Sequence, residues 1–263
     1  MDLQLKGLHV LVTGGSRGIG LACAELFLQE GARVSLVGRS QANLDKARAA
    51  LEANAPGRVA CFAADLQNAQ SAREAVDAAE AQVGPVDVLV NSAGAARRTP
   101  FNELTPEAWH GAMDAKFFSY IHVIDPLVKR MGERGKGVIV NVIGMGGKVA
   151  TPTHLAGGAA NAALMLATAG LAAAWGPNGV RVNAVNPALT LTERMAEGIA
   201  ADARLRGMTP EEVLKQATAR APLGRLATPQ DIANMVVFLA SPKSGYVSGA
   251  IVSMDGAATP LVV

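Results

Sequence analysis

The sequence predicts an α/β fold: one doubly wound, mostly parallel sheet of seven strands with helices on both faces. Short apolar runs rich in β-branched residues, typical of buried strands, alternate with longer segments whose apolar residues recur at helical spacing. Glycines follow several of these runs directly. Repeated strand–helix units form parallel sheets through right-handed crossovers, and such sheets bind ligands at the carboxyl ends of their strands. The sequence therefore predicts a crevice at that edge.

The predicted elements follow in regular order. Residues 8–12 form the first strand, and a helical pattern then continues until Gly31. Thr105-Pro106 and Thr209-Pro210 are typical helix starts, because threonine caps open N–H groups and proline fits the first helical turn. Further strands are expected over residues 33–38, 58–63, 86–91, 138–143, 181–186 and 250–254. Further helices are expected over residues 41–54, 69–83, 106–131, 155–175, 193–206, 210–219 and 229–240.

Size and charge limit the classes of function. With 263 residues and 50% hydrophobic content, residues 1–263 are expected to form a single domain. A net charge of +2 and 4% aromatic residues predict neither a nucleic-acid partner nor binding to an anionic membrane. Cys23 and Cys61 are expected to be free thiols, and no apolar leader is expected at the amino terminus. We therefore predict a cytoplasmic protein.

One uncharged stretch tests this prediction. Residues 149–180 contain no lysine, arginine, aspartate or glutamate, and a membrane-spanning helix needs about 20 apolar residues. However, alanine and glycine dominate the run, which also holds Asn161 and Thr168. We therefore expect a helix covered on all sides by protein.

The chain is organised around the glycine-rich turn of residues 13–20, between the first strand and the first helix. Gly14, Gly18 and Gly20 let the backbone approach a ligand, and the N–H groups that open a helix favour phosphate. A tight turn that binds nothing is the alternative.

These motifs resemble the short-chain dehydrogenase/reductase family over nearly the whole chain. The turn that Thr13 opens has the family's glycine spacing. Residues 90–94, Val-Asn-Ser-Ala-Gly, resemble its Asn-x-Ala-Gly motif, and residues 183–187 resemble the run that usually ends in Pro-Gly. Pro222-Leu-Gly-Arg and Asp255-Gly256 resemble its carboxyl-terminal signatures. The resemblance implies a Rossmann-type fold that binds a nicotinamide dinucleotide.

The expected cofactor site lies on the loops after the strands. Arg17 and Arg39, with no acid after the second strand, favour NADP(H) over NAD(H), because guanidinium groups suit a 2′-phosphate. Solvated surface arginines are the alternative, and Asn91 has the alternative role of capping its turn. The expected cofactor-binding residues are Gly14, Ser16, Arg17, Gly18, Ile19, Gly20, Arg39, Asp65, Leu66, Asn91, Ala93, Gly94, Pro187, Thr190 and Thr192. No metal site is expected.

The family's catalytic set is missing. The resemblance places the family's proton-donating tyrosine at Gly157 and its lysine, four residues on, at Asn161. It places the serine that polarises the substrate oxygen at Gly144, and the asparagine of the long helix at Lys116. Glycine has no proton to give, and an amide carries no charge that could lower a pKa. The catalytic residues are therefore unknown at this point.

Other side chains near these positions are candidate substitutes. Lys116 would serve if burial lowered its pKa, and His154 lies three residues before Gly157. Lys148, Thr151 and Thr153 are on the same loop. For each, an ordinary surface or capping role is the alternative. The only tyrosines, Tyr120 and Tyr246, are expected to lie far from the site.

Three functions follow from these observations. The first is an NADP(H)-dependent carbonyl or alcohol oxidoreductase with atypical or weak activity. The second is a dinucleotide-binding protein without turnover, acting as a sensor or partner subunit. The third is a non-redox enzyme that reuses the crevice. Restoring the family's serine, tyrosine and lysine together, by G144S, G157Y and N161K, is expected to produce carbonyl reduction if the crevice is intact.

The resemblance also implies a lid and an assembly. Residues 189–225 resemble the family's variable substrate lid, in which Met195, Leu205, Met208 and Leu214 are expected to line a pocket or to pack on the body. The uncharged helix and the long helix before it resemble the pair through which family members associate. We therefore expect a homodimer or a homotetramer, and an unidentified small-molecule substrate.

Overall fold

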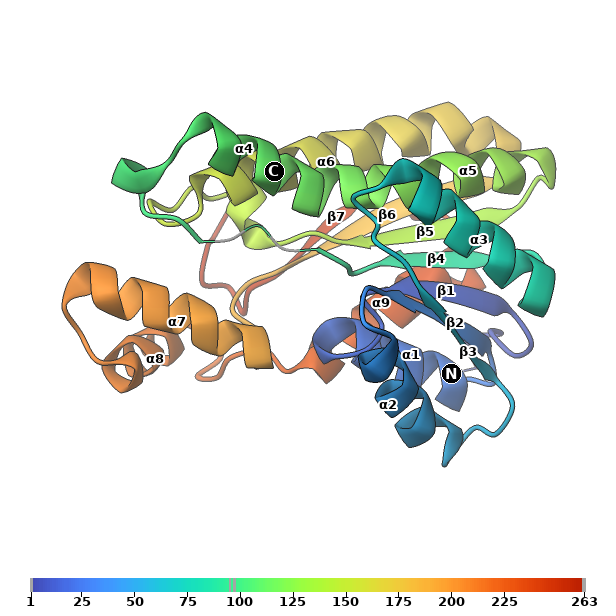
Figure 1. The fold of residues 1–263 in the computed structure, drawn as a ribbon, viewed down its shortest axis with the longest axis horizontal. Coiled ribbons are helices and arrows are strands. Elements are labelled where there is room, and N and C mark those ends of the chain that lie inside the picture. Colours follow the sequence, from blue (N-terminus) through green and yellow to red (C-terminus); the bar gives the residue numbers. More distant parts are fainter. Residues whose placement is uncertain (1, 95, 97, 262–263) are drawn as a thin grey trace.

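The computed structural model describes residues 2–94, 96 and 98–261, and its seven strands form one parallel sheet in the order β3-β2-β1-β4-β5-β6-β7 (Figure 1). The strands are β1 (His9–Thr13), β2 (Arg33–Gly38), β3 (Val59–Ala63), β4 (Val88–Asn91), β5 (Gly137–Val142), β6 (Val180–Pro187) and β7 (Ile251–Met254). All neighbouring pairs run parallel. The predicted doubly wound α/β class is confirmed. The strand order reverses between β1 and β4, which is where such sheets bind ligands.

Helices cover both faces of the sheet. On one face lie α1 (Gly18–Gln29), α2 (Gln41–Glu52) and α9 (Pro229–Ala240), and on the other α3 (Ala69–Val83), α5 (Ser119–Glu133) and α6 (Leu155–Trp175) (Figure 1). In β1, Val10 and Val12 belong to the core under α1, whereas Leu11 belongs to the core under α5. Both faces of the strand are buried, which explains its continuous apolar run.

The long helix predicted over residues 106–131 is interrupted. It divides into α4 (Pro106–Ala112), a π-helical turn η2 (Met113–Phe118) and α5. As predicted, the Thr105 hydroxyl caps α4 by accepting a hydrogen bond from the Ala108 amide. A wide π turn re-aims the side chains that follow it and is frequent at functional sites. Lys116 lies within this turn.

The expected lid forms two helices at one end of the molecule, α7 (Glu193–Arg206) and α8 (Pro210–Ala219) (Figure 1). Ile199, Ala203 and Val213 form a small core of their own. Met195, Met208 and Leu214 pack against it, while Leu205 is 46% exposed. The lid therefore has a small core of its own, and Glu193 and Asp202 also join it to the body of the protein.

Helix α6 is not covered on all sides, so that prediction was wrong for the single chain. Leu166 is 78% exposed, and Ala162 and Ala169 beside it are also exposed. By length and composition alone, residues 155–178 would also suit a membrane span, but 44% of their most apolar window is buried inside the fold. A core helix of a soluble protein passes the same test.

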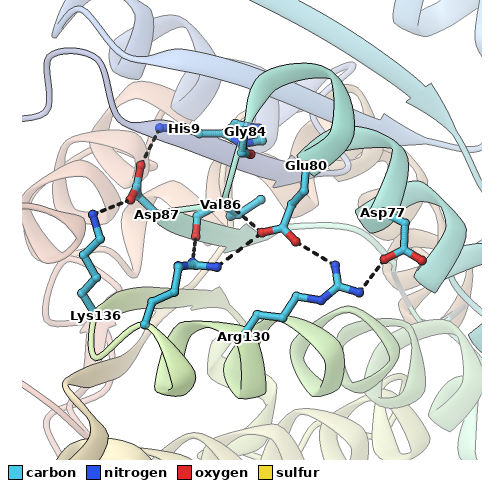
Figure 2. Close-up of polar contacts among 9 residues, drawn as sticks. His9, Asp77, Glu80, Gly84, Val86, Asp87, Arg130 and Lys136 are labelled. Carbon is cyan, nitrogen blue, oxygen red and sulfur yellow. Dashed lines mark hydrogen bonds and ion pairs between the residues drawn. The ribbon is translucent and has the colours of Figure 1, made fainter.

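An ion-pair network fastens α3 to α5 at the opposite end of the strands from the glycine turns (Figure 2). Arg130 bonds Asp77 and Glu80, and Arg134 bonds Glu80 and the Val86 carbonyl. Next to it, the buried His9 ring contacts the Gly84 carbonyl at 2.6 Å and the Ser35 hydroxyl at 2.8 Å.

Candidate active site

Two adjoining hollows lie at the carboxyl ends of the strands. The nucleotide lobe has a volume of about 980 Å³ and is lined by the loops after β1 to β4. The substrate lobe has a volume of about 940 Å³ and is lined by the loops after β4 to β6, the start of α6, and α7. Ile19, Ser92, Gly94 and Thr192 line both lobes, so the two hollows form one continuous crevice.

Glycines shape the nucleotide lobe. Gly14 adopts a φ of +65°, and a Cβ there would lie 2.8 Å from the Ala93 Cα. Gly18 adopts a φ of +56° at the start of α1 and lines the lobe with Ser16 and Ile19. The open N–H groups of α1 and the absence of side chains leave a cradle suited to phosphate.

Basic residues border this lobe, as the sequence predicts. Arg17 and Arg39 are both exposed and both line it, and the Arg17 guanidinium lies 4.0 Å from the Glu193 carboxylate of the lid. Exposed Asp65 and buried Leu66 follow β3, and Ala93 and Gly94 follow β4.

Two of the predicted cofactor residues do not line either lobe. A Cβ on Gly20 would overlap the Gly14 carbonyl oxygen, so its role is to let α1 pack closely on the turn. Asn91 is fully buried, accepts from the Thr13 hydroxyl and donates to Asn141, whose own amide donates to Thr168. Asn91 therefore cross-links β1, β4, β5 and α6 beneath the crevice.

The remaining predicted cofactor residues, Pro187, Thr190 and Thr192, line the substrate lobe. Pro187 ends β6, and Thr190 pairs with Ala227 in an isolated bridge that ties this loop to the segment before α9. Thr192 precedes α7 and lies 3.4 Å from the position that a Cβ on Gly18 would take. The β6 loop thus faces the glycine turn.

Gly144, Gly157 and Asn161 come together in the substrate lobe. The Asn161 Nδ2 lies 3.2 Å from where a Gly144 Cβ would be, and its Oδ1 is buried without a hydrogen-bond partner among the described residues. The three positions at which the resemblance places the family's serine, tyrosine and lysine are therefore close together in the fold. No hydroxyl is present at position 144 or 157.

His154 occupies the space beside Gly157, the position at which the resemblance places the family's tyrosine. A Cβ added to Gly157 would overlap the His154 Cε1, and one added to Gly146 would lie 2.7 Å from its Cδ2. Its Nδ1 is buried and has no hydrogen-bond partner among the described residues. Burial, with the nearby charges of Arg98 and Lys116, lowers the pKa of His154 to about 4. The ring is therefore neutral near pH 7.

Lys116 lines the same lobe, and the alternative of a solvated surface charge is wrong. Only 7% of it is exposed, and its Nζ donates to the Tyr120 hydroxyl at 2.8 Å and the Val142 carbonyl at 3.0 Å. Burial and the charge of Arg194 lower the pKa of Lys116 to about 7. A Cβ on Gly94 would overlap the Ala115 carbonyl, so the β4 turn and the π turn pack closely at this point.

The expectation that Tyr120 lies far from the site is also wrong. It is fully buried directly beneath the lobe, and its hydroxyl donates to the Val142 carbonyl at 2.5 Å. Tyr120 itself does not line the lobe, and burial raises its pKa. It therefore supports Lys116 rather than meeting a substrate. Tyr246 is fully exposed elsewhere.

Of the other candidate substitutes, some line the substrate lobe and others do not. Thr151 lines the substrate lobe, whereas the buried Thr153 hydroxyl donates to Asp202 and accepts from Arg98. Lys148 does not line the lobe, and its amine donates to the Ser253 hydroxyl at 3.1 Å.

Sequence reasoning missed several residues of the crevice. Ser92 lies between both lobes, and Arg98, Arg194 and Arg204 also line both. Ser92 was visible within the Asn-Ser-Ala-Gly run. The arginines carried no signal, because they come from the segment after β4 and from the lid, which only the fold brings together.

A family model described as enoyl-(acyl carrier protein) reductase matches residues 14–259 of the chain. A 3alpha-hydroxysteroid dehydrogenase from Mediterraneibacter gnavus is 35% identical over 98% of this chain and 99% of its own length. The chain belongs to the short-chain dehydrogenase/reductase family.

Solved structures of family members match the fold closely. An L-sorbose reductase from Gluconobacter frateurii, in complex with NADPH and L-sorbose, has a TM-score of 0.92 at 29% identity and full coverage of both chains. An NADPH-bound short-chain oxidoreductase from Pseudomonas aeruginosa, described as containing an atypical catalytic center, has a TM-score of 0.87. It is 33% identical over 98% of this chain and all of its own. These relatives of the dehydrogenase/reductase family bind NADPH.

Proposed function

We propose that this family member is an NADP(H)-dependent oxidoreductase that acts on a carbonyl or alcohol group of a small molecule, with atypical or weak turnover. One observation carries the proposal: the nucleotide and substrate lobes are continuous through Ile19, Ser92, Gly94 and Thr192. A dinucleotide that enters the first lobe can thus extend into the second, which holds a titratable amine.

The residues of the nucleotide lobe fit this cofactor. Gly14 and Gly18 leave the cradle open, and Arg17 and Arg39 border the same lobe. Two guanidinium groups suit the additional phosphate that distinguishes NADP(H) from NAD(H). When bound, the reduced nicotinamide supplies a hydride to a carbonyl carbon. The NADPH of the two structural relatives is consistent with this choice.

The substrate lobe explains why activity is expected to be atypical. Gly144 and Gly157 offer no hydroxyl, and Asn161 offers no charge. General acid–base assistance contributes about 10²–10⁴-fold in rate, and polarisation of the substrate oxygen about 10²–10³-fold. We therefore expect no carbonyl reduction by the usual groups, and expect any turnover to use other side chains.

The first test is a fluorescence titration with NADPH and NADH, followed by turnover on a panel of ketones, ketoses, hydroxysteroids and secondary alcohols. We expect NADPH to bind more tightly than NADH, and slow turnover of some panel members. The relatives act on a sugar and a steroid, so the panel must span both sizes. Failure to bind NADPH would refute the proposal and favour a non-redox reaction in the crevice.

A second function is dinucleotide binding without turnover, as a sensor or partner subunit. The position of His154 favours it, because the ring fills space beside Gly157 where the usual tyrosine would begin. Tight NADPH binding with no turnover of any panel member would select this function.

We further propose a cytoplasmic location, no metal, no nucleic-acid partner and no membrane. The described cysteines, Cys23 and Cys61, are both free, which suits a reducing compartment. No group of three or more metal-binding side chains occurs among the described residues. Assembly into a homodimer or homotetramer is proposed as well, because the exposed apolar Leu166 on α6 suits a contact between copies of the chain.

A further inference from the structure

Lys116 is a buried amine without an acidic partner among the residues that the structure describes. Among the side chains that the structure describes, no carboxylate forms an ion pair with it, and its two acceptors, Tyr120 and Val142, are neutral. The described residues that line the substrate lobe include no aspartate or glutamate. A buried charge without a partner is costly, so such a lysine is retained against a considerable penalty.

The surroundings of Lys116 bring its pKa close to neutral pH. Tyr120 on α5, Arg194 on α7 and His154 before α6 interact with this lysine, and Arg98 after β4 lines the same lobe and acts on His154. Burial and Arg194 bring its pKa to about 7. An amine with such a pKa both holds and releases a proton at neutral pH, which is the property that a general acid needs.

We propose that Lys116 is the catalytic acid of this site, and that its Nζ gives a proton to the substrate oxygen in place of the tyrosine that the chain lacks. The geometry carries this proposal: two hydrogen bonds fix Nζ, and Lys116 lines the lobe that is also lined by Gly144, Gly157 and Asn161. It rests on the proposed oxidoreductase function.

Atoms and electrons balance in this step. The carbonyl carbon accepts the hydride, which forms a C–H bond, and the π electrons of the C=O bond move to the oxygen. That oxygen takes a proton from the Nζ–H of the Lys116 ammonium, and the alcohol is formed. Lys116 is left as a neutral amine and regains a proton from solvent. In alcohol oxidation, the neutral amine accepts the hydroxyl proton.

His154 and Asn161 suit other roles. The pKa of His154 is about 4, so its neutral ring can donate a hydrogen bond but holds little transferable charge at pH 7. The unpaired Asn161 Oδ1 can accept from a hydroxyl of the ligand. Relative to the family resemblance, the amide and the amine have exchanged positions: asparagine is at 161 and lysine at 116.

The first experiment measures the protonation of Lys116 without turnover. In protein labelled at the lysine side-chain nitrogen, the Lys116 resonance is assigned by its loss in Lys116→Arg and titrated by NMR. We expect a midpoint near 7. A midpoint at about 10, as in an ordinary lysine, would overturn the proposal.

The second experiment uses Lys116→Met, with Lys148→Met as the matched control on a loop beside the lobe. For Lys116→Met we expect kcat to fall about 10²–10⁴-fold and the pH dependence near 7 to disappear. NADPH affinity and the melting temperature are measured in parallel, so that a folding defect is recognised. Lys148→Met is expected to keep the rate and the pH profile.

Two contrary outcomes are distinguishable. If the wild type turns over and folded Lys116→Met retains its rate and pH profile, Lys116 has only a structural role and the acid assignment is wrong. If the wild type binds NADPH but reduces no panel member, the proposed function fails, and the acid role of Lys116 fails with it.

Discussion

The side-chain nitrogen of Lys116 lies 2.8 Å from the hydroxyl oxygen of Tyr120, one helical turn away, and both groups donate to the carbonyl of Val142. The Lys116 nitrogen also lies 4.6 Å from the centre of the Tyr120 ring. The hydroxyl and the aromatic ring of Tyr120 thus both stabilise the positive charge of the Lys116 ammonium.

Tyr120→Phe is expected to lower the pKa of Lys116, because the ammonium loses one acceptor while the ring face remains. A hydrogen bond to a charged group contributes about 1.5–3 kcal/mol, which corresponds to a shift of about one pKa unit or more. The NMR titration of Lys116 measures this shift, and the pH optimum should move to lower pH with it. Exposed Tyr246→Phe is the control. An unchanged midpoint would show that the tyrosine hydroxyl does not stabilise the charge.

Arg39→Ala is expected to weaken NADPH binding about 10–100-fold and NADH binding little, because only NADPH carries a 2′-phosphate for the guanidinium. Fluorescence titration of both cofactors gives the ratio. Arg48→Ala, on α2 and paired with Glu52, is the control. Equal losses for both cofactors would contradict a 2′-phosphate contact and leave Arg39 as a general surface charge.

Rebuilding the family's catalytic set requires a fourth substitution. Any Cβ introduced at position 157 would overlap the His154 ring and lie 2.8 Å from the Ala96 Cβ, so Ala96 must also shift slightly. Position 144 has a φ of +137°, at which a serine is strained by about 1–3 kcal/mol. We therefore expect the triple variant G144S, G157Y and N161K to be inactive until H154A is added. The four together should raise NADPH oxidation with ketones about 10²-fold or more over the wild type. Equal activity of the triple and quadruple variants would show that His154 does not block the site.

The exposed face of α6 is the expected contact for a homodimer or homotetramer. Leu166 is 78% exposed within an uncharged helix, and small neighbours allow close helix packing. Leu166→Glu is expected to yield monomers, since it would bury a charge at that contact. Light scattering at micromolar concentration measures the mass, with Leu205→Glu on the lid as control. A monomeric wild type would refute the assembly.

His9 is expected to make stability depend on pH. Burial lowers its pKa below 6.5, and its neutral ring both bonds the Gly84 carbonyl and accepts from Ser35. The unfolded state therefore binds more protons below pH 6.5, and the folded state loses up to about 1.4 kcal/mol per pH unit through this residue. Urea unfolding between pH 8 and 5.5 measures the slope. The slope should become shallower in His9→Gln, in which the contribution of buried His154 remains, and should not change in exposed His110→Gln.

The order of strands and helices could be read from the sequence because it depends on local patterns. Apolar runs, the Thr105 cap and the glycine turn each act within a few residues, and parallel strands bring their following loops to one edge. The family positions of Gly144, Gly157 and Asn161 followed from the resemblance alone. The π turn was missed, because the helical pattern of residues 106–131 predicts only one continuous helix.

The doubly wound sheet and the glycine-rich turn could be predicted from the sequence, which also shows directly that positions 144 and 157 carry no hydroxyl. The burial of Lys116, its support by Tyr120 and the filling of the space beside Gly157 by His154 emerge only when the chain folds. The physical reason is that the pKa of an amine depends on how much water its neighbours exclude. Those neighbours come from β5, α5, α6 and α7, which lie far apart in the sequence.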